Sequence, residues 1–264
     1  METTAVLIHM IADYGHGDLA FAEVRQRLAL FVPEAEVFLT PVPAFDTVSA
    51  GFCAAQLART EGSPDRLVYT NVAPRADRPD PRHDNEGEQL VAAVLPDGVV
   101  VVGVNSGHSF SFVGDQTDVR EVTVPEGGSQ FRSRDLFPPV VADLARGDLG
   151  ALGAGLGAER IPPPPERAVA YVDGYGNLKT TWTTAPFESG QQVEIIAGEA
   201  SSVAVVTDGT FAVRHGEMSF APGSSGWDTA GGHRQFYEVL LRGGSAADRL
   251  GRPRAGDPLD VRRL

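Results

Sequence analysis

Short apolar runs alternate with helix-like patterns over the first 160 residues. Apolar runs of strand length are typical of strands buried on both faces of a sheet. They cover residues 5–10, 36–39, 67–70, 90–95 and 99–104. Apolar positions at helical spacing predict helices over residues 19–31, 48–58 and 135–145. This alternation predicts an α/β domain with a largely parallel central sheet.

The pattern changes in the last hundred residues. Short β-favouring segments follow one another there, separated by turns rich in Gly, Asp and Pro. They cover residues 168–172, 179–182, 192–196, 202–206, 211–214, 235–241 and 259–262. Such a series predicts an all-β domain, a small barrel or sandwich. Four prolines at 162–165 separate the two patterns, and neither a helix nor a central strand accommodates them. The sequence therefore predicts two domains, residues 1–160 and 167–264.

Charge and composition exclude several kinds of partner. The formal net charge is −13, and basic residues form no run, which argues against nucleic-acid backbones and anionic membranes. No stretch reaches 18 uninterrupted apolar residues, so we expect no membrane span. Cys53 is the single cysteine, which allows no disulfide framework and no cysteine zinc site. The first residues lack the features of a signal peptide, and we expect a cytoplasmic protein.

Polar loops follow the predicted strands of the first domain, where open α/β sheets bind ligands. Asp13 comes just after the first strand, and a carboxylate there can accept hydrogen bonds from both hydroxyls of a ribose. The alternative is that Asp13 or Asp18 caps the following helix. Further polar segments begin at Asn71, at Asn105 and at residue 130. Each of them is compatible with a ligand site or with ordinary helix capping.

A second polar segment opens the C-terminal domain, at residues 171–180. It contains Asp173-Gly174 and Gly176-Asn177, which by spacing alone are typical of a hairpin turn.

Several short motifs follow one another in an order that resembles a known family. They are Asp13-Tyr14-Gly15, Pro43-Ala44-Phe45-Asp46, Asn105 with Gly107, Phe131-Arg132-Ser133-Arg134-Asp135, Asp173-Gly174-Tyr175-Gly176-Asn177 and Ser224-Ser225-Gly226. Taken together, they resemble the fluorinases, chlorinases and S-adenosylmethionine (SAM) hydrolases. The resemblance covers essentially the whole chain.

The resemblance implies roles for particular residues. Asp13 would hold the ribose hydroxyls, Phe45 would pack near the sulfonium, and Asn105 would lie in the nucleoside pocket. The methionine part would be bound by residues of the second domain: Asp173, Asn177 and Ser224, with Tyr175 in the same segment. Family members are trimers whose site lies between one subunit's first domain and a neighbour's second domain. The resemblance therefore implies a homotrimer that binds a small nucleoside ligand.

The implied reaction is attack on the 5′ carbon of SAM, with methionine as the leaving group. A sulfonium is already activated, so the protein mainly positions and desolvates the nucleophile. We expect no metal and no cofactor beyond SAM itself as the substrate. Water is the first nucleophile considered, which would give adenosine and methionine. The alternatives are transfer to a halide or another anion, and a protein that binds SAM or adenosine without turnover.

The positions that distinguish these reactions depart from the family pattern. Asn71 stands where the hydrolases have an aspartate, and Arg132 stands where they have a histidine. Arg78 matches the hydrolase arginine, with Arg75 as a nearby substitute, and Ser133 matches the fluorinase form. The candidate catalytic residues are Asn71, Arg78, Arg132 and Ser133. Guanidinium groups there can favour an anion or orient water. Alternatively, they form ordinary ion pairs, for which the nearby acids are Asp77, Asp80 and Asp84.

Overall fold

The structure is a computed structural model that describes residues 6–76, 78–81, 86–114 and 117–264. The chain divides into two compact units, Met1–Pro163 and Pro164–Leu264, and the division falls inside the run of prolines. Each unit has its own sheet and its own apolar core. No helix among the described residues is long and apolar enough to cross a membrane.

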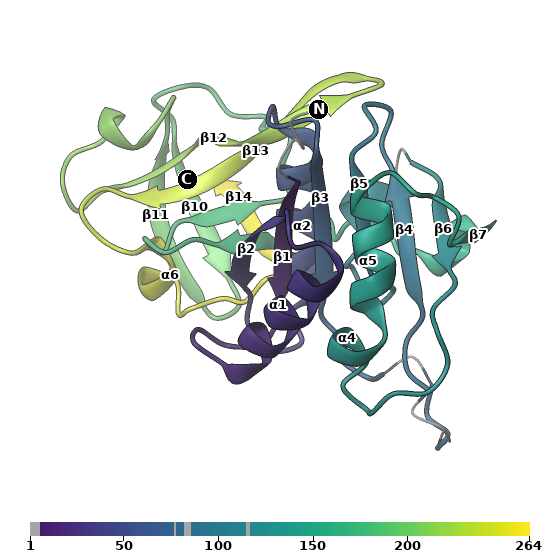
Figure 1. The fold of residues 1–264 in the computed structure, drawn as a ribbon. Helices are drawn as coiled ribbons and strands as arrows, with labels where there is room; N and C mark the ends of the chain where they lie inside the picture. The colour runs from purple at the N-terminus through teal and green to yellow at the C-terminus, as the bar shows by residue number, and fades with distance from the viewer. Residues whose placement is uncertain (1–5, 77, 82–85, 115–116) are drawn as a thin grey trace. The chain divides into compact units, whose positions relative to one another are not determined.

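A mixed sheet forms the centre of the first unit (Figure 1). Its described strands lie in the order β2-β1-β3-β5-β4-β6-β7. They are β1 (Leu7–Ala12), β2 (Glu36–Pro41), β3 (Arg66–Asn71), β4 (Leu90–Val94), β5 (Val100–Val104), β6 (Val119–Val122) and β7 (Leu152–Gly155). The strands β2, β1, β3 and β5 are parallel to one another. Their carboxyl ends therefore meet at one edge of the sheet.

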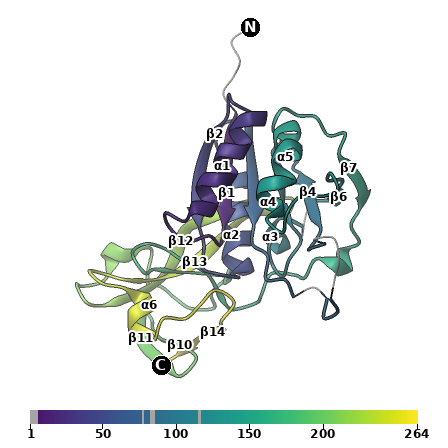
Figure 2. The ribbon, with the colours of Figure 1, turned by 60° about the horizontal axis from the view of Figure 1, so that its bottom comes forward.

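Helices cover both faces of this sheet (Figures 1 and 2). They are α1 (Leu19–Phe31), α2 (Thr47–Arg59), α3 (Ser111–Gly114), α4 (Arg132–Asp135) and α5 (Phe137–Ala145), with a 3-10 helix at Ala158–Arg160. One face packs against α1 and α5, through alternate strand residues such as Ile8, Met10 and Tyr69. The other face packs against α2. Because helices cover both faces of the sheet, its central strands β3 and β5 are buried along their whole length, and most of their residues are apolar.

Two aspartates fix the starts of the long helices. Asp18 caps α1 and accepts a hydrogen bond from the Ala20 nitrogen at 2.8 Å. Asp46 caps α2 and accepts from the Ser49 nitrogen at 2.8 Å; burial raises the pKa of this carboxyl. Both helices therefore begin where the polar loops of the sheet edge end.

The predicted fold class is wrong. The prediction was an α/β domain with a largely parallel sheet, joined to a barrel or sandwich, whereas the architecture is β-rich with two mixed sheets. In the first unit, β4, β6 and β7 all pair in the antiparallel direction. The tight turn at Pro96-Asp97-Gly98 makes β4 and β5 a hairpin, which requires this direction. The short strands β6 and β7 then extend the sheet from β4 and were not predicted.

A second mixed sheet makes up most of the C-terminal unit. Its described strands lie in the order β14-β10-β11-β12-β13-β9-β8. They are β8 (Val169–Val172), β9 (Leu178–Thr180), β10 (Gln192–Ala197), β11 (Ala200–Val206), β12 (Met218–Thr229), β13 (Gly232–Leu241) and β14 (Leu259–Arg263), with helix α6 at Ala246–Arg249 and a 3-10 helix at Thr210–Ala212. The edge strands meet at one end, where the Leu259 nitrogen donates to the Arg167 oxygen at 2.7 Å.

Two segments of this unit differ from the prediction. Residues 211–214, predicted as a strand, lie largely in the 3-10 helix and the turn that follows it. Strand β12 was not predicted, because its sequence contains Pro222, Gly223 and Gly226, which weaken the strand signal. The register between β12 and β13 shifts between Pro222 and Gly226, so the irregular residues form a bulge inside a long hairpin.

Candidate functional site

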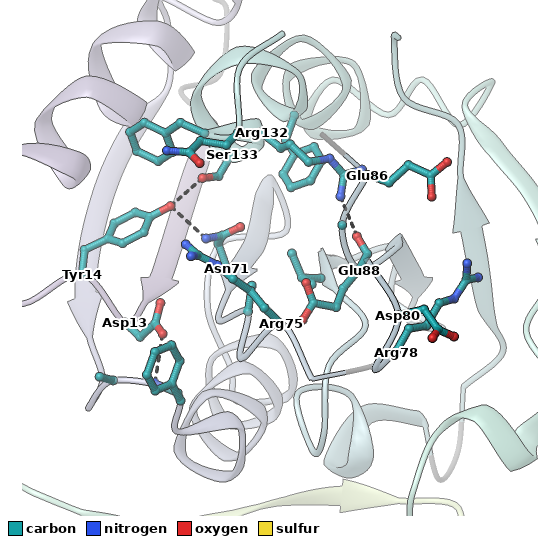
Figure 3. A pocket seen from close by; sticks show the side chains of 18 residues that line it. Asp13, Tyr14, Asn71, Arg75, Arg78, Asp80, Glu86, Glu88, Arg132 and Ser133 are labelled. Carbon is teal, nitrogen blue, oxygen red and sulfur yellow. Dashed lines mark hydrogen bonds between the residues drawn. The ribbon is translucent and has the colours of Figure 1, made fainter. Parts of the chain in front are cut away.

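A cavity of about 610 Å³ lies at the carboxyl ends of the parallel strands of the first unit (Figure 3). Small-molecule sites in proteins usually measure about 300–1,000 Å³. Its walls include predicted site residues from separate parts of the chain: Asp13 after β1, Phe45 before α2, Asn71 at the end of β3, Arg78 in the following loop, and Arg132 and Ser133 in α4. The fold therefore brings these six residues together.

Asp13 is held at the wall of the cavity by the loop before α2. Its Oδ2 accepts a hydrogen bond from the Phe45 nitrogen at 3.0 Å. Phe45 has a φ of 64°, an uncommon value for a residue with a side chain, and its ring is 62% exposed. No described residue donates to the other oxygen, Oδ1. The capping alternative is confirmed for Asp18, which caps α1, whereas Asp13 does not cap this helix and its Oδ1 remains available to a ligand.

A chain of hydrogen bonds connects three polar side chains across the cavity wall. The Asn71 Nδ2 donates to the Tyr14 hydroxyl at 2.8 Å, and this hydroxyl lies 2.6 Å from the Ser133 Oγ (Figure 3). Burial raises the pKa of Tyr14 well above its ordinary value, and the nearby charges of Asp13 and Asp18 add to the effect. Tyr14 is therefore a neutral phenol. Asn71 acts as a donor in this chain, and an amide is no proton acceptor for catalysis at neutral pH.

Arg132 is fixed by the backbone and by an aromatic ring. Its Nη1 donates to the Glu88 carbonyl oxygen at 2.8 Å, and its guanidinium lies 5.1 Å from the centre of the Phe137 ring. Gly87 leaves room for this arrangement, since a Cβ there would lie 2.7 Å from Nη1. The neighbouring Arg134 instead pairs with Asp135 and Glu23, at 2.7 and 3.1 Å.

Arg75 and Arg78 also line the cavity. The alternative of ordinary ion pairs named Asp77, Asp80 and Asp84 as their partners. Asp80 is described and lines the same cavity without an ion pair to either arginine, whereas Asp77 and Asp84 lie outside the described residues. Within the described part of the chain, neither guanidinium is matched by a carboxylate. The cavity wall thus contains two guanidinium groups without an ion pair, among four carboxylates, and a bound anion can pair with them.

Glu88 also lies in the wall of the cavity, and no sequence motif pointed to it. Glu88 is 5% exposed, and its Oε1 is buried without a hydrogen-bond partner. Such groups are rare, because burying an unpaired polar atom costs free energy. In the sequence Glu88 ends a long polar loop, and nothing in the pattern distinguishes it from an exposed loop acid.

Asn105 lines a neighbouring cavity of about 930 Å³. This second cavity shares Arg78, Glu88 and Arg132 with the first. The backbone nitrogen of Asn105 donates to the Gln89 oxygen at 2.8 Å, which ties the end of β5 to the start of β4. Asn105 therefore lines a cavity that adjoins the first one and is not itself among the residues of the first cavity.

The predicted methionine-binding segment of the second unit forms the turn between β8 and β9. Asp173 Oδ1 accepts from the backbone nitrogens of Tyr175 and Asn177, at 2.9 and 3.0 Å. Its Oδ2 accepts from the Asn177 side chain at 3.0 Å. Tyr175 is 83% exposed. The segment is thus a turn between two strands, as its spacing predicts. The exposed Tyr175 ring is available for contact.

Ser224, the last predicted site residue, lies in β12, which β13 separates from β9, the strand that follows this turn. Its nitrogen donates to Glu238 Oε1 at 3.0 Å, and its Oγ lies 3.4 Å from Lys179 Nζ. Lys179 and Glu238 form an ion pair at 2.8 Å. Ser224 therefore belongs to a polar cluster whose members already satisfy one another.

Metal ligands do not gather at either place. Throughout the described ranges, no three side chains of His, Cys, Asp or Glu are arranged so that they could hold a metal ion. The polar groups of the cavity are instead arginines, carboxylates, an amide and hydroxyls, which suit an organic ligand with hydroxyl or anionic groups.

Comparisons with known proteins show a similar fold. No protein-family model and no curated protein matches the sequence. An uncharacterized conserved protein from Thermotoga maritima is similar in structure, with a TM-score of 0.75 and 20% identity, over 96% of this chain and 99% of that one. A conserved hypothetical protein from Thermus thermophilus has a TM-score of 0.66 and 24% identity, over 98% of this chain and 100% of that one. At these identities the likeness establishes the fold.

Proposed function

We propose that this protein binds SAM through its adenosine part in the 610 Å³ cavity and cleaves it at the 5′ carbon, with water as the nucleophile. The observation that carries the proposal is that six residues assigned from sequence motifs surround one cavity. They come from distant parts of the chain, and the sequence alone did not require them to meet. The products would be adenosine and L-methionine.

Within this proposal Asp13 anchors the ribose. Its carboxylate is fixed by the Phe45 nitrogen and retains one oxygen without a donor among the described residues. A ribose hydroxyl can supply this missing hydrogen bond. Phe45 presents an exposed ring beside Asp13, and such a ring can pack against the sugar or attract the sulfonium.

The second unit would contact the methionine part, and the active assembly would be a homotrimer in the cytoplasm. These parts of the proposal rest on the motif resemblance.

One observation favours a second candidate, transfer of the adenosyl group to an anion. Arg75 and Arg78 line the cavity without an ion-pair partner among the described residues. Guanidinium groups of this kind attract small anions. A halide or another anion held there would need no proton acceptor, and the absence of an acid at position 71 would then be no handicap.

The test is incubation of the purified protein with SAM, with and without chloride, followed by chromatography of the nucleosides. Adenosine formed without halide supports hydrolysis, and a chloride-dependent 5′-substituted adenosine supports the second candidate. Tight binding of SAM in calorimetry without any product would contradict both reactions and indicate a binding protein.

Asp13→Asn tests the placement of the ligand. We expect SAM affinity to fall about 10–100-fold, because the exchange replaces a charge-assisted hydrogen bond, worth about 1.5–3 kcal/mol, by a weaker one. Asp65→Asn is the matched control, since Asp65 is an exposed acid of the same unit outside the cavity. Equal affinity in both variants, measured by calorimetry, would refute the ribose assignment.

A further inference from the structure

We infer that Glu88 is the proton acceptor for the attacking water, the role that an amide at position 71 cannot fill. This inference rests on the proposed hydrolysis and assigns a further residue to it. It starts from an observation independent of the motifs, the buried and unpartnered carboxylate oxygen of Glu88.

Hydrogen bonds to the backbone hold Glu88 in place. Its carbonyl oxygen accepts from Arg132 at 2.8 Å, and the oxygen of the next residue, Gln89, accepts from the Asn105 nitrogen at 2.8 Å. The residue is thus held between α4 and the ends of β4 and β5. Figure 3 shows its side chain among the groups that surround the cavity, separate from the Arg132 bond to its backbone.

The other polar groups of the cavity are less suited to accept a proton. Asn71 donates its amide to Tyr14, and burial raises the pKa of Tyr14, so the phenol stays protonated. Asp13 accepts from the Phe45 nitrogen at the ribose position proposed above. Among the acids that line the described part of the cavity, the remaining two, Asp80 and Glu86, are exposed.

Because Glu88 is buried without a donor to Oε1, a hydrogen bond from water or from a ligand group would stabilise it. A carboxyl group with a buried oxygen that lacks a donor is destabilised, and a water molecule bound beside Glu88 in the cavity can donate a hydrogen bond to this carboxyl group. A water held by a carboxylate is oriented with a lone pair directed away from it, ready to attack. Glu88 also lines the neighbouring 930 Å³ cavity, so this residue borders both cavities.

In the chemical step, the water oxygen forms a bond to the 5′ carbon as the bond from this carbon to sulfur breaks, and the bonding electron pair passes to sulfur. The sulfonium becomes the neutral thioether of methionine. The water gives one proton to the Glu88 carboxylate, which later releases it to solvent, and adenosine carries the new 5′ hydroxyl.

Glu88→Gln keeps the shape of the side chain and removes its basicity. We expect kcat for adenosine formation to fall about 100–10,000-fold, the usual contribution of a general base, while the calorimetric Kd for SAM changes less than about threefold. Glu88→Asp should retain part of the activity, because it keeps a carboxylate. Glu61→Gln removes an exposed charge of the same unit outside both cavities and should leave kcat unchanged.

The outcomes separate this inference from the proposal on which it rests. If the wild-type protein makes adenosine and Glu88→Gln makes it equally fast, the assignment of Glu88 is wrong and the proposed hydrolysis stands. If Glu88→Gln loses affinity for SAM in proportion to kcat, Glu88 is a binding residue and the inference is overturned. If the wild-type protein makes no adenosine, both are overturned. Circular dichroism of each variant checks that the fold is intact.

Discussion

Each unit of this protein contains a buried glutamate, and the two differ in the hydrogen-bond donors that surround them. Glu238 is 4% exposed and Glu88 is 5% exposed. Glu238 Oε1 is surrounded by donors, including Lys179 at 2.8 Å and the Ser224 nitrogen at 3.0 Å. Glu88 Oε1 has none. The same side chain at the same depth is therefore a structural element in one unit and an unsatisfied group at a cavity in the other.

The difference shows how to separate a structural acid from a functional one. The depth of burial alone does not separate the two kinds of acid, because both glutamates are almost completely covered. Their hydrogen-bond partners do separate them. A buried charge that is paired and hydrogen-bonded belongs to the architecture, whereas one that lacks partners beside a cavity is suited to bind a ligand or a solvent molecule.

The sharpest way to test this contrast is to neutralise each glutamate and measure stability. Glu238→Gln should lower the free energy of unfolding of the second unit by about 3 kcal/mol, since it leaves the Lys179 ammonium poorly compensated in a largely buried place. Glu88→Gln should leave the stability of the first unit unchanged or raise it, because it replaces a carboxyl group that has a buried oxygen without a partner.

The chain offers a separate probe for each unit in urea unfolding. Both tryptophans, Trp182 and Trp227, are buried in the second unit, so their fluorescence follows that unit. The longest described helices, α1, α2 and α5, belong to the first unit, so circular dichroism at 222 nm follows mainly this unit.

The double variant Glu238→Gln with Lys179→Met should recover part of the stability that Glu238→Gln loses. A loss in Glu88→Gln as large as that in Glu238→Gln would remove the contrast.

A smaller effect is expected at the glycines beside the two glutamates. A Cβ at Gly223 would collide with the Glu238 side chain, which its donors hold in place, whereas a Cβ at Gly87 would approach Arg132 Nη1 less closely, at 2.7 Å. Gly223→Ala should therefore cost about 2 kcal/mol, and Gly87→Ala less than about 1 kcal/mol. The same two optical probes measure both changes. Equal costs would mean that the donors do not hold Glu238 rigidly.

The smallest effect is expected on the stability of the first unit at alkaline pH. Burial raises the pKa of Tyr14 and of the fully buried Tyr69 above their ordinary values. In the unfolded chain both ionise near pH 10. The folded unit keeps both protons to higher pH, so its stability is complete below about pH 10 and falls as the pH rises, by about 1.4 kcal/mol per tyrosine and pH unit.

Urea unfolding at pH 9, 10 and 11, followed at 222 nm, measures this slope. Tyr14→Phe should reduce the slope, because Tyr69 alone then contributes. A slope that is the same in Tyr14→Phe would show that the Tyr14 phenol ionises as readily in the folded state as in the unfolded chain.

The sequence predicted local elements well and their pairing poorly. The apolar runs and helical spacing located β1, α1, β3 and α2 to within a few residues, because these elements carry their own periodicity. The direction of pairing depends on contacts between distant segments. Strand β7, with the sequence LGAG, has almost no local strand signal, yet it pairs with β6 and helps to make the sheet mixed.

The candidate site was also predictable only in part. Asp13 and Asn71 were found because they follow strands, and parallel strands end at one edge. Asn105 follows a strand too, but it lines the second cavity. Glu88 was missed because its distinguishing property is burial without a partner. That property arises from tertiary contacts between distant segments, such as that of Arg132 with the Glu88 backbone, which no sequence pattern of the loop records.

The pairing of Lys179 with Glu238 also has a consequence for chemical labelling. Lys179 is the sole lysine of the chain, and its side chain is 15% exposed. Acylating reagents must reach the amine, whereas the folded protein holds this one in a largely buried ion pair with Glu238. The rate at which the Lys179 side chain is acylated therefore measures how often β9 separates from β13. The side-chain label is confined to this one position.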